Sequence, residues 1–389
     1  MSNNTIGSSC HIATGKLDAN QAVEGGGFPF FTCAEFPCTI DSFAFDDDVV
    51  LIAGNNARGN FHVSRYSGKF NAYQRTYVLT AKGGFDIDYV YYALKLELRR
   101  LREKSQGSQT KFLTMPILNN IGLNNIGHGE QIVISKVLAK LDKKISLNNK
   151  INAELEAMAK LIYDYWFVQF DFPDANGKPY KSSGGKMVYN EALKREIPDE
   201  WNLMPLEGIV DVISDTVTPS DICSKTAYIG LEHIPRKTII LSDWETAEKV
   251  DSNKSKCKKM DILFGKIRPY FHKVGICFVD GITSTDTIVL RAKEKKLQGI
   301  ALQTVFTEHF VESATNSSTG TKMPRANWTV LKNYKTPMPP NELLCKYQSL
   351  FDDIVAKIEV SIYQNKELTE LRDWLLPMLM NGQVTVNDS

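Results

Sequence analysis

One short segment holds the densest group of side chains that could bind a phosphate backbone. Between residues 254 and 273, seven cations stand against the single carboxylate of Asp261. Such a cluster is a candidate phosphate-binding face, because Lys and Arg side chains attract phosphate groups. For any one of these lysines, a solvated loop is about as good an interpretation. The cations are Lys254, Lys256, Lys258, Lys259, Lys266, Arg268 and Lys273.

Residue patterns that would carry out chemistry are missing from the sequence. It contains neither G-x-G-x-x-G nor G-x-x-x-x-G-K-[ST], the glycine loops that hold nucleotide phosphates. The Pro339-Pro340 pair is followed by Asn341, not by the aromatic residue of a base-methylating tetrapeptide. The seven cysteines form no C-x-x-C pair, which argues against a zinc site and a disulfide framework. We therefore expect no catalytic residues and no metal, with a degenerate modification enzyme as the alternative.

Length and composition indicate a folded protein of two or three domains. The chain has 389 residues, of which 43% are hydrophobic and 23% charged, with a net charge of +1. No apolar run reaches the roughly 18 residues that a membrane span requires. The first residues have neither a basic stretch nor an apolar core, so they do not resemble a secretory signal. A cytoplasmic location is the expectation.

The two halves of the sequence repeat each other weakly. A shift of 211 residues superposes Gly54 on Gly265, each at the end of an apolar, strand-like run. The same shift superposes the run at 76–81 on that at 287–292. It also brings the pair Thr110 and Lys111 onto Thr321 and Lys322. We interpret this as a duplicated globular unit.

Two long helical patterns repeat at a shift of 217 residues. Apolar residues in the first pattern step alternately by four and three, which is the heptad seam of a coiled coil. Asn148 and Asn365 occupy matching seam positions, where they either form a polar layer that fixes the register or face water. Pro377 is expected to kink or end the second helix, and Gly382 to cap it. The first seam is Ile134, Leu138, Leu141, Ile145, Asn148, Asn152, Leu155, Ala159 and Ile162.

These patterns predict a mixed α/β protein in which two similar globular domains alternate with two long helices. The helices would pair as an antiparallel coiled coil, although a long return connection could also permit parallel pairing. The expected boundaries are 1–128 for the first domain, 129–170 for the central helix, 171–199 for a connector, 200–338 for the second domain and 339–389 for the C-terminal helix and tail. Two globular domains on a rigid helical spacer could both contact one side of a DNA double helix, because the major groove returns to that side every ~34–36 Å.

Several segments of the sequence resemble the specificity (S) subunits of type I restriction–modification enzymes. The carriers are GNFHVSRYSGKFNAYQRTYVLTA at 59–81, DILFGKIRPYFHKVGICFVDGITSTDTIVLR at 261–291, STGTKMPRANWTVLKNYKTPMPP at 318–340 and LRDWLLPMLMNGQVTV at 371–386. The resemblance implies two target recognition domains on an antiparallel spacer. It also implies binding to double-stranded DNA, to two methylation (M) subunits and to a motor-nuclease (R) subunit. S-adenosylmethionine, ATP and Mg would lie on those partners, and this chain would bind no cofactor.

The resemblance places DNA contacts in the loop after each Gly54/Gly265 strand and at the threonine–lysine pairs. Arg and Asn can read guanine and adenine edges, whereas Lys more often contacts phosphate. The first domain also lacks the strand-like lead-in that opens the second at Trp201, so its outer strand is in doubt. The candidates in the first domain are Asn55, Asn56, Arg58, Arg65, Lys69, Arg75, Thr110 and Lys111. Those in the second are Lys266, Arg268, Tyr270, His272, Lys273, Thr321, Lys322 and Arg325.

Overall fold

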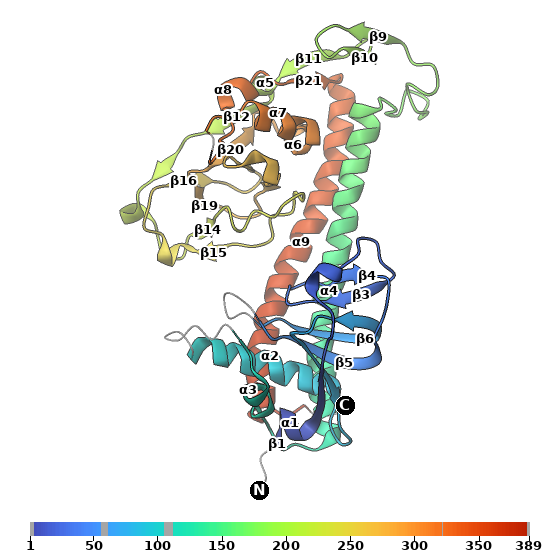
Figure 1. Cartoon of the computed structure of the whole chain (residues 1–389). Helices are drawn as coiled ribbons and strands as arrows, with labels where there is room; N and C mark the ends of the chain where they lie inside the picture. Colours follow the sequence, from blue (N-terminus) through green and yellow to red (C-terminus); the bar gives the residue numbers. More distant parts are fainter. Residues whose placement is uncertain (1–3, 56–60, 105–111, 321, 387–389) are drawn as a thin grey trace. The chain divides into compact units, whose positions relative to one another are not determined.

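The computed structural model describes residues 4–55, 61–104, 112–320 and 322–386. The chain divides into two compact units (Figure 1). Unit 1 comprises Met1–Ser146 and Asn365–Ser389, and unit 2 comprises Leu147–Gln364. The two long helices, α4 (His128–Tyr163) and α9 (Asn341–Met380), each contribute one part to unit 1 and the other part to unit 2.

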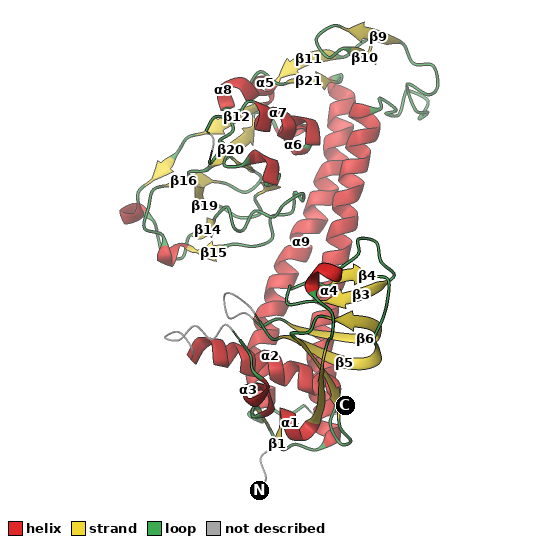
Figure 2. Cartoon of the chain, in the orientation of Figure 1, coloured by secondary structure: helices red, strands yellow, loops and turns green. Residues whose placement is uncertain are grey.

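Unit 1 is built on a six-stranded sheet in the order β2-β7-β5-β6-β3-β4 (Figure 2). Neighbouring strands are antiparallel except β3 and β6, which are parallel. The central strands are long apolar runs, and Val49 to Ala53 of β5 are all buried. The strands are β2 (Cys10–Thr14), β3 (Phe28–Phe31), β4 (Cys38–Ile40), β5 (Phe45–Ala53), β6 (Val63–Ala72) and β7 (Thr76–Ala81).

Side chains on the two faces of this sheet belong to different hydrophobic clusters. Val50 and Ile52 pack with α2 (Ile87–Lys104) and with the parts of α4 and α9 that belong to unit 1. Val49 and Leu51 point to the other face, where they pack with Phe70 and other aromatic rings. This alternation follows from the two-residue period of a strand, which sends successive side chains to opposite faces.

The first domain does have a lead-in strand, although it is short. β1 (Asn4–Thr5) pairs with β8 (Gly122–Leu123), which lies just before α4. The corresponding ladder of unit 2 joins β11 (Asn202–Pro205) to β21 (Lys335–Met338), just before α9. The outer strand of the first domain, which the sequence left in doubt, is therefore present. A two-residue strand leaves no apolar alternation that the sequence could reveal. The remaining small elements of unit 1 are α1 (Ile6–Ser9), η1 (Ala19–Gln21) and α3 (Met115–Asn119).

Unit 2 contains two sheets and two short ladders. One sheet has the order β12-β20-β17-β18 and the other the order β13-β16-β19-β14-β15. The segment 171–199, predicted as a plain connector, contains a hairpin of β9 and β10 and packs Phe172 and Ile197 into the core of the unit. The strands of unit 2, besides β11 and β21, are β9 (Met187–Asn190), β10 (Arg195–Pro198), β12 (Val210–Ile213), β13 (Thr216–Val217), β14 (Ala227–Ile229), β15 (Glu245–Thr246), β16 (Lys254–Cys257), β17 (Ile262–Gly265), β18 (Val274–Ile276), β19 (Gly281–Ser284) and β20 (Thr287–Ala292).

Helices cover the four-stranded sheet and join it to the spacer part of unit 2. Every residue of α6 is buried, and its Gly299 leaves room for the rings of Tyr347 and Phe351 on α9. The helices are α5 (Leu206–Ile209), α6 (Gln298–Phe306), α7 (Glu308–Asn316) and α8 (Trp328–Leu331). The tighter or wider turns are η2 (Asp164–Val168, a π-helical turn), η3 (Pro219–Asp221), η4 (Ala247–Lys249), η5 (Pro269–Phe271) and η6 (Lys295–Leu297).

Within each unit, its parts of α4 and α9 run antiparallel (Figure 1). In unit 1, Arg372 Nη1 lies 2.8 Å from Asp142 Oδ1. In unit 2, Asn148 Nδ2 donates to Gln364 Oε1 at 3.3 Å, and the rings of Tyr163 and Tyr347 are 6.5 Å apart. Residues later in α4 thus contact residues earlier in α9, which makes the paired parts antiparallel, as the sequence predicted. All nine predicted seam positions of α4 are buried or half-buried.

The C-terminal helix does not end at Pro377, one of the two expected outcomes there besides a kink. The helix continues through this proline to Met380. Proline removes one N–H and its ring crowds the carbonyl four residues earlier, and packing of the neighbouring Leu376 and Leu379 offsets this cost. Gly382 does cap the helix as expected, with φ at 69° and its N–H donating to the carbonyl of Leu379.

Strand pairing confirms the duplication and corrects its register. Arg75 carbonyl accepts from Gly54 N–H, and Asp286 carbonyl accepts from Lys266 N–H in the same way. Gly54 is therefore equivalent to Lys266, not to Gly265, and the shift is 212 residues here against 211 between β7 and β20. A one-residue slip of this kind reverses which face a side chain occupies, so it decides which residues correspond.

The seam buries two asparagines in unit 2. Asn148 is 2% exposed and bonded to Gln364, as a register-fixing layer would require. Asn365, its partner in the repeat, is only half-buried. Asn152 is 5% exposed, and its Oδ1 accepts no hydrogen bond. A buried acceptor without a partner costs stability.

Replacing Asn152 by Leu should therefore raise the stability of unit 2, by about 1 kcal/mol, because an apolar seam position replaces an unsatisfied amide. Urea unfolding of the full chain measures the change. Asn148→Leu is the matched control and should gain less, because it also removes the bond to Gln364. Equal effects in the two variants would contradict this account.

Candidate nucleic-acid interface

The structure describes eleven of the sixteen predicted DNA-contact residues. Asn56, Arg58, Thr110, Lys111 and Thr321 lie outside the described residues. In unit 1, Asn55 and Arg75 lie near the end of β5, whereas Arg65 and Lys69 lie on β6. In unit 2, most of the described candidates lie in the turn after β17.

In unit 2 the chain makes a tight turn directly after β17. Arg268 and His272 both adopt left-handed backbone conformations, with φ at 50° and 51°, on either side of η5. The Arg268 N–H donates to the carbonyl of Pro324, and His272 Nε2 lies 2.9 Å from the carbonyl of Phe306. Such conformations are costly for side chains other than glycine and persist only when surrounding bonds hold them. The turn therefore has a fixed backbone conformation, from which its side chains project.

Two arginines share one aromatic ring on this turn. The guanidinium carbon of Arg236 lies 4.0 Å from the ring centroid of Phe271, and that of Arg268 lies 5.9 Å from it. Tyr270, beside them, is 51% exposed. No carboxylate within the described part of the chain pairs with either arginine. Their donors are therefore available to base edges or phosphates.

Two of the predicted contacts in this turn serve the fold instead. His272 is only 3% exposed, and its ring packs against Phe306. Lys273 donates its ammonium hydrogens to the carbonyl of Leu231. Burial lowers the pKa of Lys273, with the nearby Arg236 adding to the effect. A direct DNA contact by His272 does not agree with this burial.

The basic segment 254–273 does not form one continuous face. Lys254 is 7% exposed and bonded to Ser252, whereas Lys256 pairs with Asp215 at 3.4 Å and Lys259 with Glu359 at 2.5 Å. The reason is that 254–257 is strand β16, whose side chains alternate between faces. Of the seven cations, Lys258, Lys266 and Arg268 remain exposed or half-exposed, and their charged groups have no hydrogen-bond or ion-pair partner among the described residues.

In unit 1 the predicted contacts also divide. Arg65 is held by Asp48 and Asp88, each at 2.6 Å, which makes it part of the fold of the sheet. Lys69 lies 4.7 Å above the ring of Phe43. Asn55 and Arg75 lie close to a shallow hollow of about 400 Å³, which Arg75 and Phe112 help to line. This hollow is the stronger candidate surface of unit 1.

The equivalent positions of the two units carry different residues. Asn55 bridges Phe112 in unit 1, and Ile267 bridges Arg325 in unit 2, so Phe112 corresponds to Arg325. The guanidinium of Arg75 lies 5.8 Å from the Phe112 ring. In unit 2 the same two positions are Asp286 and Arg325, which form an ion pair at 3.5 Å. Unit 1 therefore carries its cation at the first position of the pair, as Arg75, whereas unit 2 carries it at the second, as Arg325.

Comparisons with known proteins relate this chain to one protein family. Residues 2–157 match the family described as the Type I restriction modification DNA specificity domain. The chain is 28% identical over 403 aligned residues to the EcoDI specificity subunit of Escherichia coli, covering 98% of this chain and 88% of that protein. It is 24% identical to the MjaIX specificity subunit of Methanocaldococcus jannaschii, covering 79% and 71%. The chain is therefore similar to the specificity subunits of type I restriction enzymes over nearly its whole length.

A solved structure has the same fold. The S subunit of a type I system from M. genitalium superposes with a TM-score of 0.56 at 15% identity, covering 100% of this chain and 96% of that one. The similarity to these relatives supports a non-catalytic role in DNA sequence specificity. Within the described residues of the chain, no group of His, Cys, Asp or Glu could hold a metal ion. No helix there is long and apolar enough to cross a membrane.

Sequence reasoning missed three residues of the candidate interface. Arg236 precedes the turn by more than thirty residues, and only the fold brings it onto Phe271. Phe112 and Asp286 were passed over because neither is a usual phosphate ligand. An alignment of the two halves at the corrected register would have paired Phe112 with Arg325, and this is the one signal that could have revealed it.

The buried histidine of the turn predicts a pH dependence of stability. Burial lowers the pKa of His272, although Glu308 and the Phe306 carbonyl oppose this and Lys237 adds to it. The unfolded chain therefore binds a proton at a higher pH, near ~6.5, than the folded chain does. The free energy of unfolding should fall as the pH drops from 7.5 to 5.5.

His272→Gln removes the titrating group and should reduce that fall, as measured by urea unfolding at the two pH values. The window lies above the range in which Glu308 titrates, and the pKa of that carboxyl is lowered by Lys237 and His272. The same slope in both proteins would show that His272 does not cause the loss.

Proposed function

We propose that the protein recognises a bipartite, asymmetric DNA site, with one half-site read by each of its two target recognition domains. This proposal rests on one observation: the two units share the same strand pairing but carry different residues at equivalent positions. The frame fixes where a side chain stands, whereas the side chain decides which base edge it can contact. The domains correspond to 1–128 and 200–338.

The Arg75–Phe112 and Asp286–Arg325 pairs support unlike half-sites. Arg75 has no carboxylate partner in the described part of the chain, and the exposed Phe112 ring limits its rotation. A free guanidinium is suited to the two acceptors of a guanine edge. Arg325 stands at the other position and is held loosely by Asp286. An aspartate at this position can itself accept a hydrogen bond from cytosine.

Arg75→Gln and Arg325→Gln should each relax recognition of a different half-site, with a loss of about 1–3 kcal/mol if the residue reads a base. A methylation-site map from cells that carry the variant subunit and its partners measures both effects. Lys178→Gln, which removes one exposed positive charge from the connector, is the control and should leave the map unchanged. Both variants altering the same half-site, or neither altering any, would contradict the proposal.

The proposal includes two methylation subunits and a restriction subunit as partners, because the relatives are named as subunits of restriction enzymes. S-adenosylmethionine, ATP and Mg would be held by those partners. The complex would act on DNA in the cytoplasm. The described residues of the chain offer a surface for such assembly on α4.

Apolar side chains form a second stripe on the unit 2 part of α4. They recur at helical spacing, about a quarter turn away from the seam that faces α9. Leu161 is 65% exposed and Met158 51%. An apolar stripe of this length on a water-exposed helix marks a protein interface. In unit 1, Leu371 and Trp374 of α9 are also exposed, at 43% and 55%. The stripe comprises Leu147, Ile151, Met158, Leu161, Tyr165 and Val168.

We expect the double substitution Met158→Asp with Leu161→Asp to weaken assembly with the methylation subunit by about tenfold or more, because it places two charges in an apolar contact. Co-purification and sedimentation with the partner measure the effect. Ala153→Asp also adds a carboxylate to an exposed position of α4, but away from the stripe, and serves as the control. Normal assembly of the double variant would exclude this surface.

A further inference from the structure

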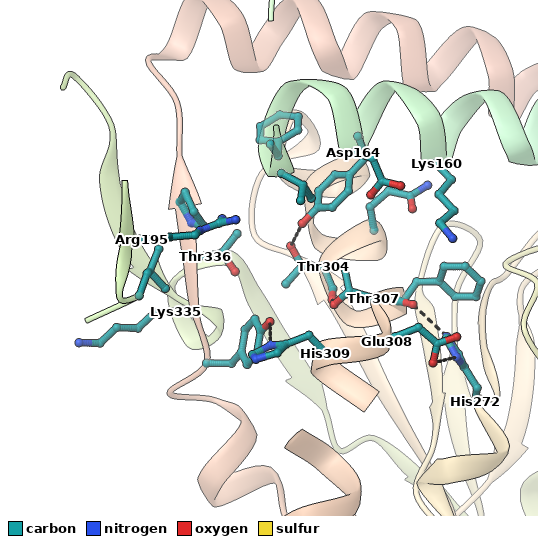
Figure 3. Close-up of a pocket in the computed structure, with 18 of the residues that line it drawn as sticks. Lys160, Asp164, Arg195, His272, Thr304, Thr307, Glu308, His309, Lys335 and Thr336 are labelled. Atoms are coloured by element: carbon teal, nitrogen blue, oxygen red, sulfur yellow. Dashed lines mark hydrogen bonds and ion pairs between the residues drawn. The ribbon is translucent and has the colours of Figure 1, made fainter. Parts of the chain in front are cut away.

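Unit 2 contains a cavity whose wall includes His272 of the turn after β17. Its volume is about 740 Å³, within the usual range for small-molecule sites. The end of α4 with η2, strand β10, the junction of α6 and α7, and strand β21 also converge on it (Figure 3), and Lys237 completes the wall near His272. These segments belong to the spacer, the connector and the second recognition domain. An occupant would therefore touch all three.

Besides His272 Nδ1, which lies 3.5 Å from Glu308, two buried polar groups in the wall of this cavity have no hydrogen-bond partner. Gln303 and Thr336 are each 2% exposed, and neither Gln303 Nε2 nor Thr336 Oγ1 makes a hydrogen bond. Buried polar atoms are nearly always paired in folded proteins, because an unpaired one costs its full desolvation. Two such atoms facing one cavity are explained by a ligand that pairs with them.

A positive charge without a carboxylate partner stands at one end of the cavity. Arg195 is half-buried, and its guanidinium carbon lies 4.9 Å from the Phe170 ring centroid. Figure 3 shows Arg195 beside Thr336. No acidic group of the described residues pairs with it. Burial lowers the pKa of Arg195, an effect that an anionic ligand would offset.

The acidic groups of the cavity do not compete for this arginine. Glu308 lies 3.2 Å from the Lys237 ammonium and 3.5 Å from His272 Nδ1, and Figure 3 shows Glu308 beside His272. Burial raises the pKa of Asp164, and the nearby Lys160 opposes the shift. Arg195 therefore keeps its donors for an outside anion, which its planar guanidinium can bind with two parallel hydrogen bonds.

Aromatic rings form much of the remaining wall. Tyr163 OH lies 3.2 Å from Thr304 Oγ1, and Tyr334 OH lies 2.7 Å from His309 Nδ1, so both hydroxyls already have partners. Their rings are left to contact an apolar or planar group. The wall groups without a hydrogen-bond or ion-pair partner among the described residues are thus the Arg195 guanidinium, the ammonium groups of Lys160 and Lys335, the Gln303 amide and the Thr336 hydroxyl, together with several ring faces.

We propose that this cavity binds a small organic anion that carries a planar ring and at least one further hydrogen-bond acceptor. Its phosphate or carboxylate pairs with Arg195, its polar atoms bond to Gln303 and Thr336, and its ring lies against the tyrosines. Because the walls come from spacer, connector and recognition domain, the bound anion ties these three parts together. It is an effector site that does not touch DNA.

Isothermal titration of the full chain with AMP and with benzene-1,2-dicarboxylate tests the site, since one probe offers a phosphate and the other carboxylates. We expect saturable binding of at least one probe, and its preference distinguishes the two kinds of anion. Arg195→Gln should weaken that binding by about tenfold or more, because it removes a charge-assisted pair. Lys178→Gln, which removes an exposed charge outside the cavity, should bind as the native chain does.

Gln303→Leu provides a readout that does not depend on the probe. Without ligand, this variant should unfold at a higher urea concentration than the native chain, since it removes an unsatisfied amide, and it should also bind the probe more weakly. Adenosine, which lacks the phosphate, should not bind. Failure of both probes at millimolar concentration, or undiminished binding by Arg195→Gln, would overturn the proposal. Binding to the free chain but not to the assembled complex would also overturn it, because a partner side chain would then occupy the cavity.

Discussion

The apolar seam between α4 and α9 is the constraint on which the rest of the molecule depends. A helix of 36 residues and one of 40 each carry a stripe that cannot remain in water. Each helix buries its stripe against the other, and within each unit the paired parts also join the core of the globular domain. Ile134 and Leu138 belong to the core of unit 1, whereas Ile354 and Ile358 belong to that of unit 2. The spacer therefore stabilises both heads.

Each head is built on the same strand frame and then made different by its side chains. The bonds from Gly54 to Arg75 and from Lys266 to Asp286 show the shared backbone. At that backbone, one unit places an arginine beside a phenylalanine and the other an aspartate beside an arginine. A protein that reads two unlike DNA sequences needs this combination, because the frame keeps the geometry constant while the residues change the hydrogen-bonding pattern.

Unit 2 also shows how strongly the second head is fixed to the spacer. Glu156 of α4 accepts hydrogen bonds from Thr238 Oγ1 at 2.6 Å and from the Ile239 N–H at 2.5 Å. Tyr363 of α9 donates to the carbonyl of Phe278 at 2.8 Å. The cavity beside Arg195 is lined by the end of the same helix α4 and by Lys237, the neighbour of Thr238 in the sequence. The attachment of the second domain to α4 and the wall of the cavity thus use neighbouring residues.

The sequence by itself determined the elements whose pattern is long and regular. The heptad steps from Ile134 to Ile162, the capping glycine at Gly382 and the absence of nucleotide-binding loops could all be read without a structure, because each depends on local spacing. The duplication was visible as well, but its register was not. Gly54 and Gly265 are the same residue type and still not equivalent, since only hydrogen bonds between strands define which residues correspond.

The tertiary structure alone decided which polar side chains are available for binding. Arg65, His272 and Lys273 have the right chemistry for DNA, but ion pairs, burial and a carbonyl bond engage them in the fold. Arg236 became a candidate because the fold places it on Phe271. The physical reason is that availability depends on neighbours distant in sequence. A lysine or arginine looks the same in a sequence whether its charge faces solvent or an aspartate from another strand.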